Sequence, residues 1–552
     1  MFKLKFGKPQ GAKEAILALL GGETSLIKDS LYTLGFKYDN LKNYWVTSRF
    51  NSHTIDYLRE IDPDIEISDF VRKKYQHCLI KPEPIFKNTL KSDMLLPHQW
   101  EALSFLQKAG SGILAYSIGT GKTLGSLSYA EYIGINTLIV CPAKLRKQWE
   151  EEIKKFTNSI GFKIVGTQSE RKELWKYSKD YHYAIISYES FLNEKDIDYI
   201  KNYSKNGMII FDEITKLKNS KSKTFKVAFE VRQQAKFAIG LTGTPYENNL
   251  GDIYALLRLI TPYYIPKYEV FAQNFLKQSE HEVFNPNTGH KIRYNRIDGE
   301  KNIEQFKKIL KPVMIRKTRE EVLNLPSEST IAYDIELTKE QREIEDILKS
   351  LAKMYPEYIL KWFIFAMENL ISPSLVNVSS ISEVAPFEAY EVQSRSIDIM
   401  TPRLETISEI LEEINGQKVI IFSKYVRALD LIQNEILKKQ GYDYREVSGR
   451  VKHPEDELLS FKNNTNTNVL CMTQAGQYGL NITEAPLLII VDKPLNPAKL
   501  DQLKGRIYRK GQKVPVTYFE LISNSPTEQR IESIISRKQV ISQKVLAREV
   551  LL

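Results

Sequence analysis

The sequence has few of the residue patterns that mark disulfide-rich, metal-dependent or membrane-spanning proteins. Its 552 residues include only three cysteines, Cys78, Cys141 and Cys471, which stand far apart and form no C-x-x-C pair. This spacing argues against a disulfide framework or a cysteine-based zinc site and favours a reducing compartment. The seven histidines contain no H-E-x-x-H, and no run approaches the ~20 apolar residues that span a bilayer. We therefore expect a cytoplasmic protein without a membrane partner, and the compact, Lys/Asn/Tyr-rich chain would suit a bacterial or phage-infected cell.

What is present is the composition of a globular chain with a mild excess of positive charge. Hydrophobic residues make up 42% of the sequence, enough to bury large cores. The chain has 78 Lys and Arg against 68 Asp and Glu, a net charge of +10. Such an excess suits a polyanionic partner, because clustered cations release counterions from phosphates. It also fits an ordinary basic surface, so charge alone leaves both readings open.

Apolar patterning divides the chain into four stretches. Residues 1–90 interleave aromatic and basic residues around a polar turn at Asp39-Asn40, which predicts a small β-hairpin unit followed by a helix over 52–61. This unit could bind bases and phosphates, or its aromatics could form a small core under a solvated basic face. Residues 266–400 have a charged, helical pattern without a clear sheet signal.

The stretches 91–265 and 401–552 alternate short apolar runs with helical segments. Runs that are apolar at every position are typical of strands buried on both faces of a parallel sheet. The predicted strands are 113–116, 137–141, 184–187, 208–211 and 237–241 in one stretch, and 418–422, 444–447, 469–472, 487–491 and 516–521 in the other. We therefore expect an α/β fold with two parallel-sheet lobes (91–265 and 401–552), a helical linking region (266–400) and a small α+β N-terminal domain (1–90).

A phosphate-binding loop is predicted between the first strand and the helix that begins near Leu124. The loop reads Gly119-Thr120-Gly121-Lys122-Thr123. Glycines let backbone N–H groups crowd around phosphates, and the helix N-terminus adds its dipole. We expect Lys122 on the β/γ-phosphates and the Thr123 hydroxyl on Mg²⁺. Tyr116 stands where the common pattern has its first glycine, and the alternative is a glycine-rich turn with a solvated lysine.

Two carboxylates, Asp212 and Glu213, end the strand predicted over 208–211. Ligands bind at the carboxyl edge of open α/β sheets. Asp212 is thus predicted to hold Mg²⁺, and Glu213 to position and deprotonate the attacking water. The alternative is that the pair merely ends the strand and caps the next helix.

Several blocks in a fixed order resemble the superfamily-two helicase-like ATPases and, within them, the Swi/Snf family. The resemblance covers roughly 95–535. In the first lobe it is carried by L-P-H-Q at 96–99, the phosphate loop at 115–123, P-A-K-L-R-K-Q-W at 142–149, I-S-Y-E at 186–189, D-E-I-T-K-L-K-N at 212–219 and L-T-G-T-P at 241–245. In the second it is carried by I-I-F-S at 420–423, S-G-R at 448–450, T-Q-A-G…G-L-N at 473–481, D-x-x-x-N-P at 492–497 and Q-L-K-G-R-I-Y-R-K-G-Q at 502–512. Departures from the family spelling are Ile214, Thr215, Gln477, Tyr478 and Leu495.

The resemblance implies two RecA-like lobes with an ATP cleft between them and a set of residue roles. Gln99 would read the adenine base, and Gly119, Thr120, Gly121, Lys122, Thr123, Gly479 and Gln502 would bind ATP. Contacts to DNA would come from Pro142, Lys144, Ser187, Lys216, Gly449, Arg450, Thr473 and Gln474. Coupling of the two sites would fall to Thr242, Gly243 and Thr244.

Arg506 and Arg509 are implied to be arginine fingers that complete catalysis with Lys122, Asp212 and Glu213. Their spacing of three predicts that they share one face of a short helix, although a surface basic helix would read the same way. The functions we weigh are a double-stranded DNA translocase that remodels or anneals branched DNA in repair, recombination or replication, a strand-separating DNA or RNA helicase, and a catalytically inactive nucleic-acid-binding scaffold. The first is preferred, with ATP and Mg²⁺ as cofactors, DNA as the partner and RNA the less favoured one.

Overall fold

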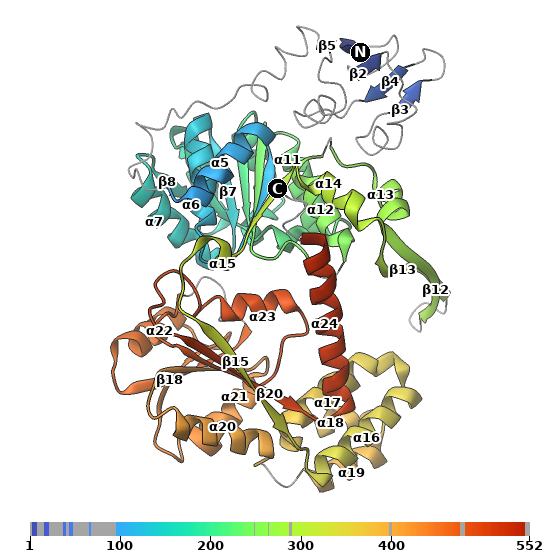
Figure 1. The fold of residues 1–552 in the computed structure, drawn as a ribbon, viewed down its shortest axis with the longest axis vertical. Helices are drawn as coiled ribbons and strands as arrows, with labels where there is room; N and C mark the ends of the chain where they lie inside the picture. Colours follow the sequence, from blue (N-terminus) through green and yellow to red (C-terminus); the bar gives the residue numbers. More distant parts are fainter. Residues whose placement is uncertain are drawn as a thin grey trace. The chain divides into compact units, whose positions relative to one another are not determined.

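The computed structural model describes residues 3–7, 16–20, 37–39, 44–47, 66–67, 95–247, 249–262, 264–285, 290–396, 400–474 and 481–546. The chain forms two compact units, Met1–Val322 with Ile541–Leu552, and Leu323–Val540. These are the first and second units (Figure 1).

The first unit is built on a seven-stranded, wholly parallel sheet in the order β14-β6-β11-β10-β7-β9-β8. Its strands are β6 (Gly112–Tyr116), β7 (Thr137–Cys141), β8 (Gly161–Lys163), β9 (Tyr183–Ser187), β10 (Met208–Asp212), β11 (Phe237–Thr242) and β14 (Met314–Lys317). The central strands are buried at every position, as their uninterrupted apolar runs predicted.

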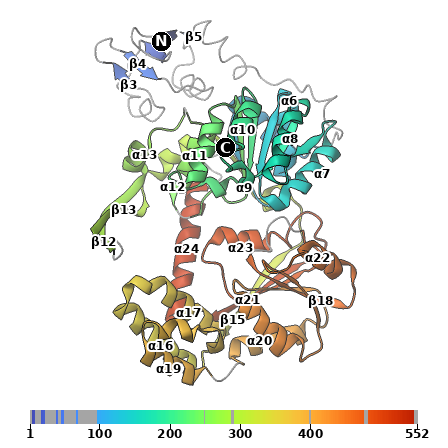
Figure 2. The same cartoon turned by 180° about the vertical axis from the view of Figure 1, so that it is seen from behind.

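Helices cover both faces of this sheet (Figures 1 and 2). Alternate strand residues such as Leu114 and Ile139 pack on one face with α5 (Pro97–Ala109), α6 (Lys122–Ile133) and α7 (Arg146–Phe156). The intervening residues, such as Ile113 and Val140, pack on the other face. That face is covered by α8 (Gln168–Tyr177), α10 (Ile197–Ser204), α11 (Lys223–Arg232) and α12 (Leu250–Ile260). The first unit is therefore a three-layer α/β lobe.

An antiparallel hairpin interrupts the helices that follow α12. Its strands β12 (Leu276–Asn285) and β13 (His290–Glu300) lie between α13 (Tyr268–Phe275) and α14 (Ile303–Leu310), and it extends away from the lobe in Figure 1. The short helices α9 (Tyr188–Phe191) and α15 (Arg319–Val322) complete this part of the unit.

The second unit contains a six-stranded parallel sheet in the order β15-β20-β19-β16-β18-β17. Its strands are β15 (Glu328–Ile335), β16 (Val419–Phe422), β17 (Asp443–Val447), β18 (Thr467–Met472), β19 (Leu487–Ile490) and β20 (Val516–Ser523). Its flanking helices are α20 (Pro402–Glu413), α21 (Val426–Ile432), α22 (Pro454–Asn463) and α23 (Pro497–Lys504). Two parallel-sheet lobes are thus confirmed.

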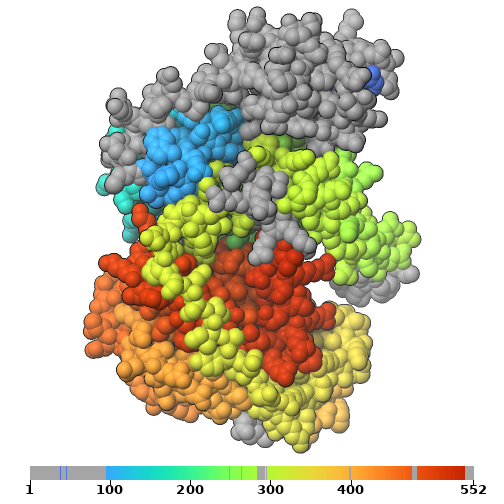
Figure 3. Space-filling model, viewed as in Figure 1, coloured from blue at the N-terminus to red at the C-terminus, as the bar shows by residue number. Residues whose placement is uncertain are grey.

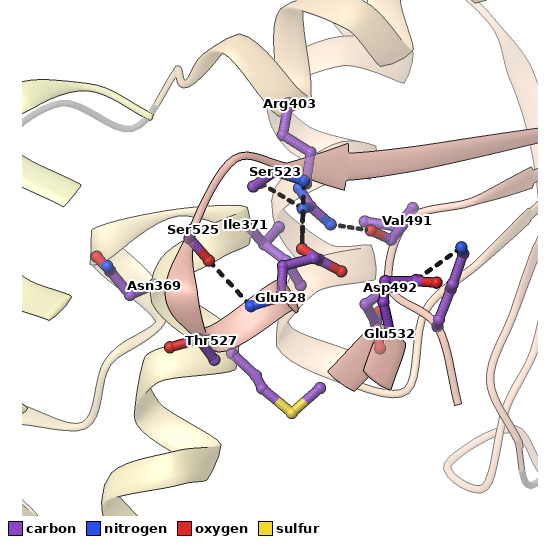
Figure 4. Close-up of polar contacts among 12 residues, drawn as sticks. Asn369, Ile371, Arg403, Val491, Asp492, Ser523, Ser525, Thr527, Glu528 and Glu532 are labelled. Carbon is purple, nitrogen blue, oxygen red and sulfur yellow. Dashed lines mark hydrogen bonds and ion pairs between the residues drawn. The ribbon is translucent and has the colours of Figure 1, made fainter. Parts of the chain in front are cut away.

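A helical subdomain and the first part of a long C-terminal helix, up to Val540, complete the second unit. The subdomain comprises α16 (Lys339–Met354), α17 (Ile359–Ile371), α18 (Val378–Ser382) and α19 (Pro386–Arg395), which share one core around Trp362. Helix α24 (Pro526–Leu546) begins directly after β20. At its start, Glu528 accepts a hydrogen bond from the buried Arg403 guanidinium at 2.6 Å (Figure 4), and the backbone N–H of Thr527 donates to Glu345 at 3.0 Å.

Four strands correct the prediction that 266–400 is helical without a clear sheet signal: the hairpin β12–β13 and the edge strands β14 and β15. β14 adds to the first sheet and β15 to the second, so the predicted limits of the lobes, 91–265 and 401–552, stop short of both. The side chains of β15 are mostly exposed, and Figure 3 shows the strand as a yellow-green band on the surface of its unit. An edge strand that is half solvated lacks the continuous apolar run of a central strand.

At the N-terminus, the described strands form a five-stranded sheet in the order β3-β4-β2-β1-β5. They are β1 (Lys3–Gly7), β2 (Ile16–Leu20), β3 (Lys37–Asp39), β4 (Tyr44–Thr47) and β5 (Glu66–Ile67). The antiparallel pairing of β3 with β4 confirms the predicted hairpin, whereas the helix predicted over 52–61 lies outside the described residues. Among the helices that the structure describes, none is long and apolar enough to cross a membrane.

Candidate active site

Three neighbouring strands of the first unit end in the predicted nucleotide motifs. β6 leads into the phosphate loop, β11 into Thr242-Gly243-Thr244, and β10 into Asp212-Glu213. The three strands are adjacent and parallel, in the order β6-β11-β10. Their carboxyl ends therefore lie side by side at one edge of the sheet, the place where open α/β sheets bind ligands.

The phosphate loop needs glycine at two positions. Gly119 and Gly121 both have φ of 84°, a left-handed conformation that side chains with a Cβ disfavour. A Cβ on Gly121 would also lie 2.3 Å from Gln99 Nε2. Gly121 is the N-cap of α6, so the loop delivers the free N–H groups of a helix N-terminus. The ammonium of Lys122, the first residue of that helix, donates to the Tyr116 carbonyl at 2.8 Å.

The block at 96–99 is attached to this loop. His98 Nε2 lies 2.6 Å from the Thr120 carbonyl, and Gln99 Nε2 donates to the Gly121 carbonyl at 3.4 Å. Gln99 Oε1 accepts from the Leu96 N–H at 2.9 Å, which closes the first turn of α5. The structure thus brings the predicted adenine-reading glutamine onto the phosphate loop.

In the acidic pair, Asp212 is buried, and Glu213 is partly exposed with an unusual backbone conformation. Asp212 is 9% exposed, and burial together with the charge of Glu213 raises its pKa to about 6, while Trp149 and the charge of Lys122 act in the opposite direction. Glu213 adopts φ of 50°, a left-handed backbone that is uncommon for a non-glycine residue. Strain of this kind costs of order 1–3 kcal/mol and gathers at functional sites.

The donor set fits a divalent cation. Two adjacent carboxylates, one of them buried, gather negative charge at one point, and burial together with the charge of Glu213 raises the pKa of Asp212. Burial and nearby Asp212 also raise the pKa of the Cys141 thiol. Mg²⁺ prefers carboxylate, hydroxyl and water oxygens, which Asp212 and Thr123 can supply.

The predicted coupling loop packs against the phosphate loop. A Cβ on Gly243 would lie 3.2 Å from Ile118 Cγ1 and 3.7 Å from the Tyr116 carbonyl oxygen. The buried Thr242 hydroxyl accepts from the Thr244 N–H at 3.0 Å. The Thr244 hydroxyl oxygen is buried and has no hydrogen-bond partner among the described residues, so it remains available to a group that enters the site.

The DNA contacts predicted for the first unit follow the next two strands, β7 and β9. Pro142 is buried at the end of β7, and Lys144 is exposed in the turn after it. Ser187 is buried, and its hydroxyl accepts from the Ser190 N–H at 3.3 Å, so its side chain caps α9. Lys216 is exposed, with its ammonium 3.9 Å from the Glu189 carboxylate.

Two aromatic residues at the site had no role in the sequence prediction. Trp149 Nε1 donates to Asp212 Oδ2 at 2.9 Å, and the Tyr188 hydroxyl donates to the Asp212 carbonyl at 2.8 Å. Both residues belong to blocks that the resemblance singled out, 142–149 and 186–189. Membership of those blocks was the only available signal, because Trp149 lies 63 positions from Asp212.

In the second unit, the structure corrects the predicted helix for Arg506 and Arg509. Helix α23 ends at Lys504, with Gly505 as its C-cap, and both arginines lie in the turns that follow. Arg506 is buried and Arg509 is partly exposed. The turns are held by the Gln512 side-chain amide, which donates to the Ile507 carbonyl at 3.2 Å. Gln502 lies in α23, where its amide oxygen accepts from Lys499 at 3.3 Å.

The DNA contacts predicted for the second unit follow two adjacent strands. Gly449 and Arg450 come after β17, Thr473 and Gln474 after β18, and the Thr473 N–H donates to the Val447 carbonyl at 3.2 Å. The Arg450 guanidinium lies 2.6 Å from both Glu446 and Asp430, and these partners raise its pKa above its ordinary value. Gly479 lies outside the described residues.

The blocks at 420–423 and 492–497 are joined by Asp492. Its carboxylate accepts from the Ser423 hydroxyl at 2.5 Å and lies 3.2 Å from the Lys424 ammonium. Two blocks separated by about seventy positions in the sequence therefore meet at the carboxyl ends of β16 and β19, which are neighbours in the sheet.

Two family models match the chain. The SNF2-related domain matches residues 62–360, and the helicase conserved C-terminal domain matches residues 402–511.

Similar proteins carry chromatin-related names. The mouse SWI/SNF-related matrix-associated actin-dependent regulator of chromatin subfamily A member 1 is 26% identical over 502 residues, 86% of this chain and 45% of that protein. The yeast (Saccharomyces cerevisiae) ISWI chromatin-remodeling complex ATPase ISW1 is 25% identical over 489 residues, 82% of this chain and 40% of that protein. The chain thus spans about half the length of the curated relatives that it matches or less.

A solved structure titled Sulfolobus solfataricus SWI2/SNF2 ATPase core in complex with dsDNA is 24% identical, covers 86% of this chain and 98% of its own, and has a TM-score of 0.38. Because one family model alone matches more than half of its residues, the chain belongs to the SNF2-related family of helicase-like ATPases.

Proposed function

We propose that this chain is an ATPase, stimulated by duplex DNA, that uses Mg²⁺ and ATP to translocate along the duplex and to remodel or anneal branched DNA. The observation that carries the proposal is the meeting of three motifs at one sheet edge: the phosphate loop, the coupling loop and the acidic pair. The next two strands, β7 and β9, end in the blocks proposed to contact DNA. One edge would thus bind nucleotide at one end and nucleic acid at the other.

The proposed chemistry is hydrolysis of ATP to ADP and phosphate. Lys122 and the N-terminus of α6 would bind the β- and γ-phosphates, and Gln99 the base. Thr123 and Asp212 would hold Mg²⁺, partly through water, and the metal would neutralise phosphate charge. Glu213 would orient the attacking water and accept its proton. Arg506 and Arg509 would stabilise charge on the transferred phosphoryl group, so that hydrolysis depends on both lobes.

The DNA preference is tested with a panel of substrates. We expect the ATPase rate to rise most with duplex and branched DNA, less with single-stranded DNA and least with RNA. Displacement of a triplex-forming third strand would report translocation. Stimulation by single strands alone would favour a strand-separating helicase, and an ATPase rate that no nucleic acid changes would contradict the proposal.

The role of Arg509 is tested by Arg509→Ala. An arginine finger acts on charge that develops in the transition state, and its loss costs about 10³–10⁵ in rate in related phosphoryl transfers. We therefore expect hydrolysis to fall by about that range while ATP affinity changes little, as measured by DNA-stimulated turnover and by binding of a fluorescent ATP analogue. Equal losses of affinity and turnover would argue against a finger.

A further inference from the structure

The backbone and the carboxylate of Asp212 are both held by residues from the blocks proposed to contact DNA. Trp149, in the block after β7, is 2% exposed and hydrogen-bonds the Asp212 carboxylate. Tyr188, in the block after β9, is 3% exposed and hydrogen-bonds the Asp212 carbonyl. In the strand order β10-β7-β9, the block after β7 lies directly beside the acidic pair. The block after β9 lies one strand farther away, and its Tyr188 hydroxyl reaches the Asp212 carbonyl. A hydrogen bond to an ionised, buried acceptor is stronger than one between neutral groups.

Exposed lysines lie within the first of these blocks and beside the second. Lys144 and Lys147 are exposed in the block that ends in Trp149. The Lys216 ammonium lies 5.2 Å from the centre of the Tyr188 ring and 3.9 Å from the carboxylate of Glu189. A phosphate that binds these lysines would thus contact the block that holds Trp149 and the lysine that lies near the Tyr188 ring. Lys147 and Trp149 are two positions apart, whereas Lys216 follows Asp212 by four positions and approaches Tyr188 through space.

Another buried tryptophan of the same unit shows that the indole N–H does not require such a partner. Trp175 is 3% exposed, and its Nε1 has no hydrogen-bond partner among the described residues. Burial alone therefore does not account for the direction of the Trp149 N–H.

We propose that Trp149 and Tyr188 are positioning residues that connect DNA contact at their blocks to the placement of Asp212. A small movement of α7 or α9 on the DNA would move the two donors and thereby turn the carboxylate into or out of its working orientation. This inference rests on the proposed function. It names the physical link by which duplex DNA would stimulate hydrolysis.

The test uses Trp149→Phe and Tyr188→Phe in the full chain. Each keeps the aromatic ring while removing the donor, and Tyr188→Phe loses a single oxygen, so it also serves if Trp149→Phe fails to fold. Two quantities are measured with and without saturating duplex DNA: the kcat for ATP, and the Kd of a fluorescent non-hydrolysable ATP analogue with Mg²⁺. For each quantity, the value with DNA is compared with the value without DNA as a ratio. Binding coupling between two sites is reciprocal and typically amounts to about 5–150-fold.

In each variant we expect the effect of DNA on kcat and on Kd to shrink by about fivefold or more, so that both ratios move toward one. In the double variant we expect less than the product of the two effects, because both residues act through one group. The matched control is Trp175→Phe. It makes the same substitution at a buried tryptophan whose N–H has no hydrogen-bond partner among the described residues, so the wild-type ratios should be kept.

Unchanged ratios in the two variants would overturn the inference. This includes the case in which the rates with and without DNA fall by the same factor, because Trp149 and Tyr188 would then only maintain the structure of the site. Absence of DNA-stimulated hydrolysis in the wild-type protein would instead contradict the proposed function itself.

Discussion

At the scale of single residues, Glu213 combines a proposed catalytic role with an unusual backbone conformation. Only four non-glycine residues in the described part of the chain have positive φ, and three of them are asparagines, which tolerate that conformation. The fourth, Glu213, follows the buried strand β10 directly. A glutamate that keeps this conformation beside the phosphate loop is held there by its surroundings, and an active site accounts for the cost.

The role of Glu213 predicts the behaviour of Glu213→Gln. General base catalysis typically contributes about 10²–10⁴ in rate, so turnover should fall by that order. Nucleotide binding should persist because the phosphate loop is untouched. Single-turnover phosphate release and titration with a fluorescent ATP analogue would measure the two quantities. A loss of binding as large as the loss of turnover would show that Glu213 acts on the ground state.

Glu368 in α17 predicts a pH dependence of stability. Burial raises the pKa of its carboxyl group to about 7, with Arg427 acting in the opposite direction, and its Oε2 is buried without a hydrogen-bond partner among the described residues. Because the folded-state pKa is above the ordinary value of 4.5, the folded state binds this proton more tightly than the unfolded state. The group therefore removes stability as pH rises from about 4.5 to about 7.

Glu368→Gln removes this titration, so its melting temperature should exceed that of the wild type by more at pH 8 than at pH 5. Thermal denaturation at the two pH values measures the difference. If the melting temperature of the variant differs from that of the wild type by the same amount at pH 5 and pH 8, the carboxyl group of Glu368 does not have a raised pKa. Glu383→Gln, in the same helical subdomain but exposed, is the control.

At the scale of elements, α24 is fixed to the second unit by a buried ion pair. Arg403 is 1% exposed and Glu528 is 3% exposed. The guanidinium also donates to the Val491 carbonyl and to the Ser523 hydroxyl, so it joins α20, the end of β19 and the end of β20 to the helix (Figure 4). Glu528 accepts from the Ser523 backbone as well, at 3.4 Å.

Glu528→Gln should therefore destabilise the second unit. Removing one partner of a buried ion pair typically costs about 3–5 kcal/mol, because the other charge remains buried. The free energy of unfolding from urea denaturation would measure the loss. Glu336→Gln removes the exposed partner of Arg342 and should change it by less than about 1 kcal/mol. If Glu528→Gln and Glu336→Gln change the free energy of unfolding by similar amounts, Arg403 binds water or another partner in place of Glu528.

The elements also show what sequence reasoning can and cannot reach. All ten strands predicted from apolar runs are present, because a strand buried on both faces leaves a continuous signal. Strands β14 and β15 were not predicted, because edge strands are partly solvated and lack a continuous apolar run. The helix predicted for Arg506 and Arg509 is absent because Gly505 ends α23, and the contacts that stabilise the following turns come from distant residues such as Pro326, whose carbonyl accepts from the Tyr508 hydroxyl.

The same distinction holds within the candidate site. The local motifs are readable because a phosphate loop or a strand-terminal acid pair needs fixed spacing. The hydrogen bond from Trp149 to Asp212 cannot be predicted from the sequence, because it depends on how α7 packs beside β10. Links between motifs, unlike the motifs, arise from tertiary packing.

At the scale of the whole molecule, the N-terminal segment differs in kind from the two lobes. Its described strands form a small sheet of their own, and its sequence interleaves aromatic and basic residues. Trp45 is buried, whereas Tyr38 is 40% exposed with its ring 5.3 Å from that of Trp45. An exposed aromatic among lysines can stack a base while the cations pair phosphates. We propose on this basis that the N-terminal segment contacts DNA that has unpaired bases, as at a fork or branch.

Removal of residues 1–85 should therefore change substrate preference more than turnover. We expect the ATPase rate on plain duplex to stay within about twofold, because the nucleotide motifs and their neighbouring strands are retained. The extra stimulation by forked or four-way DNA should disappear, since stacking contributes about 1–3 kcal/mol per base. Tyr38→Ala in the full chain should reproduce part of the loss, which separates a stacking role from a purely structural one. If fork and duplex still stimulate the shortened chain in the wild-type proportion, recognition of branched DNA belongs to the lobes themselves.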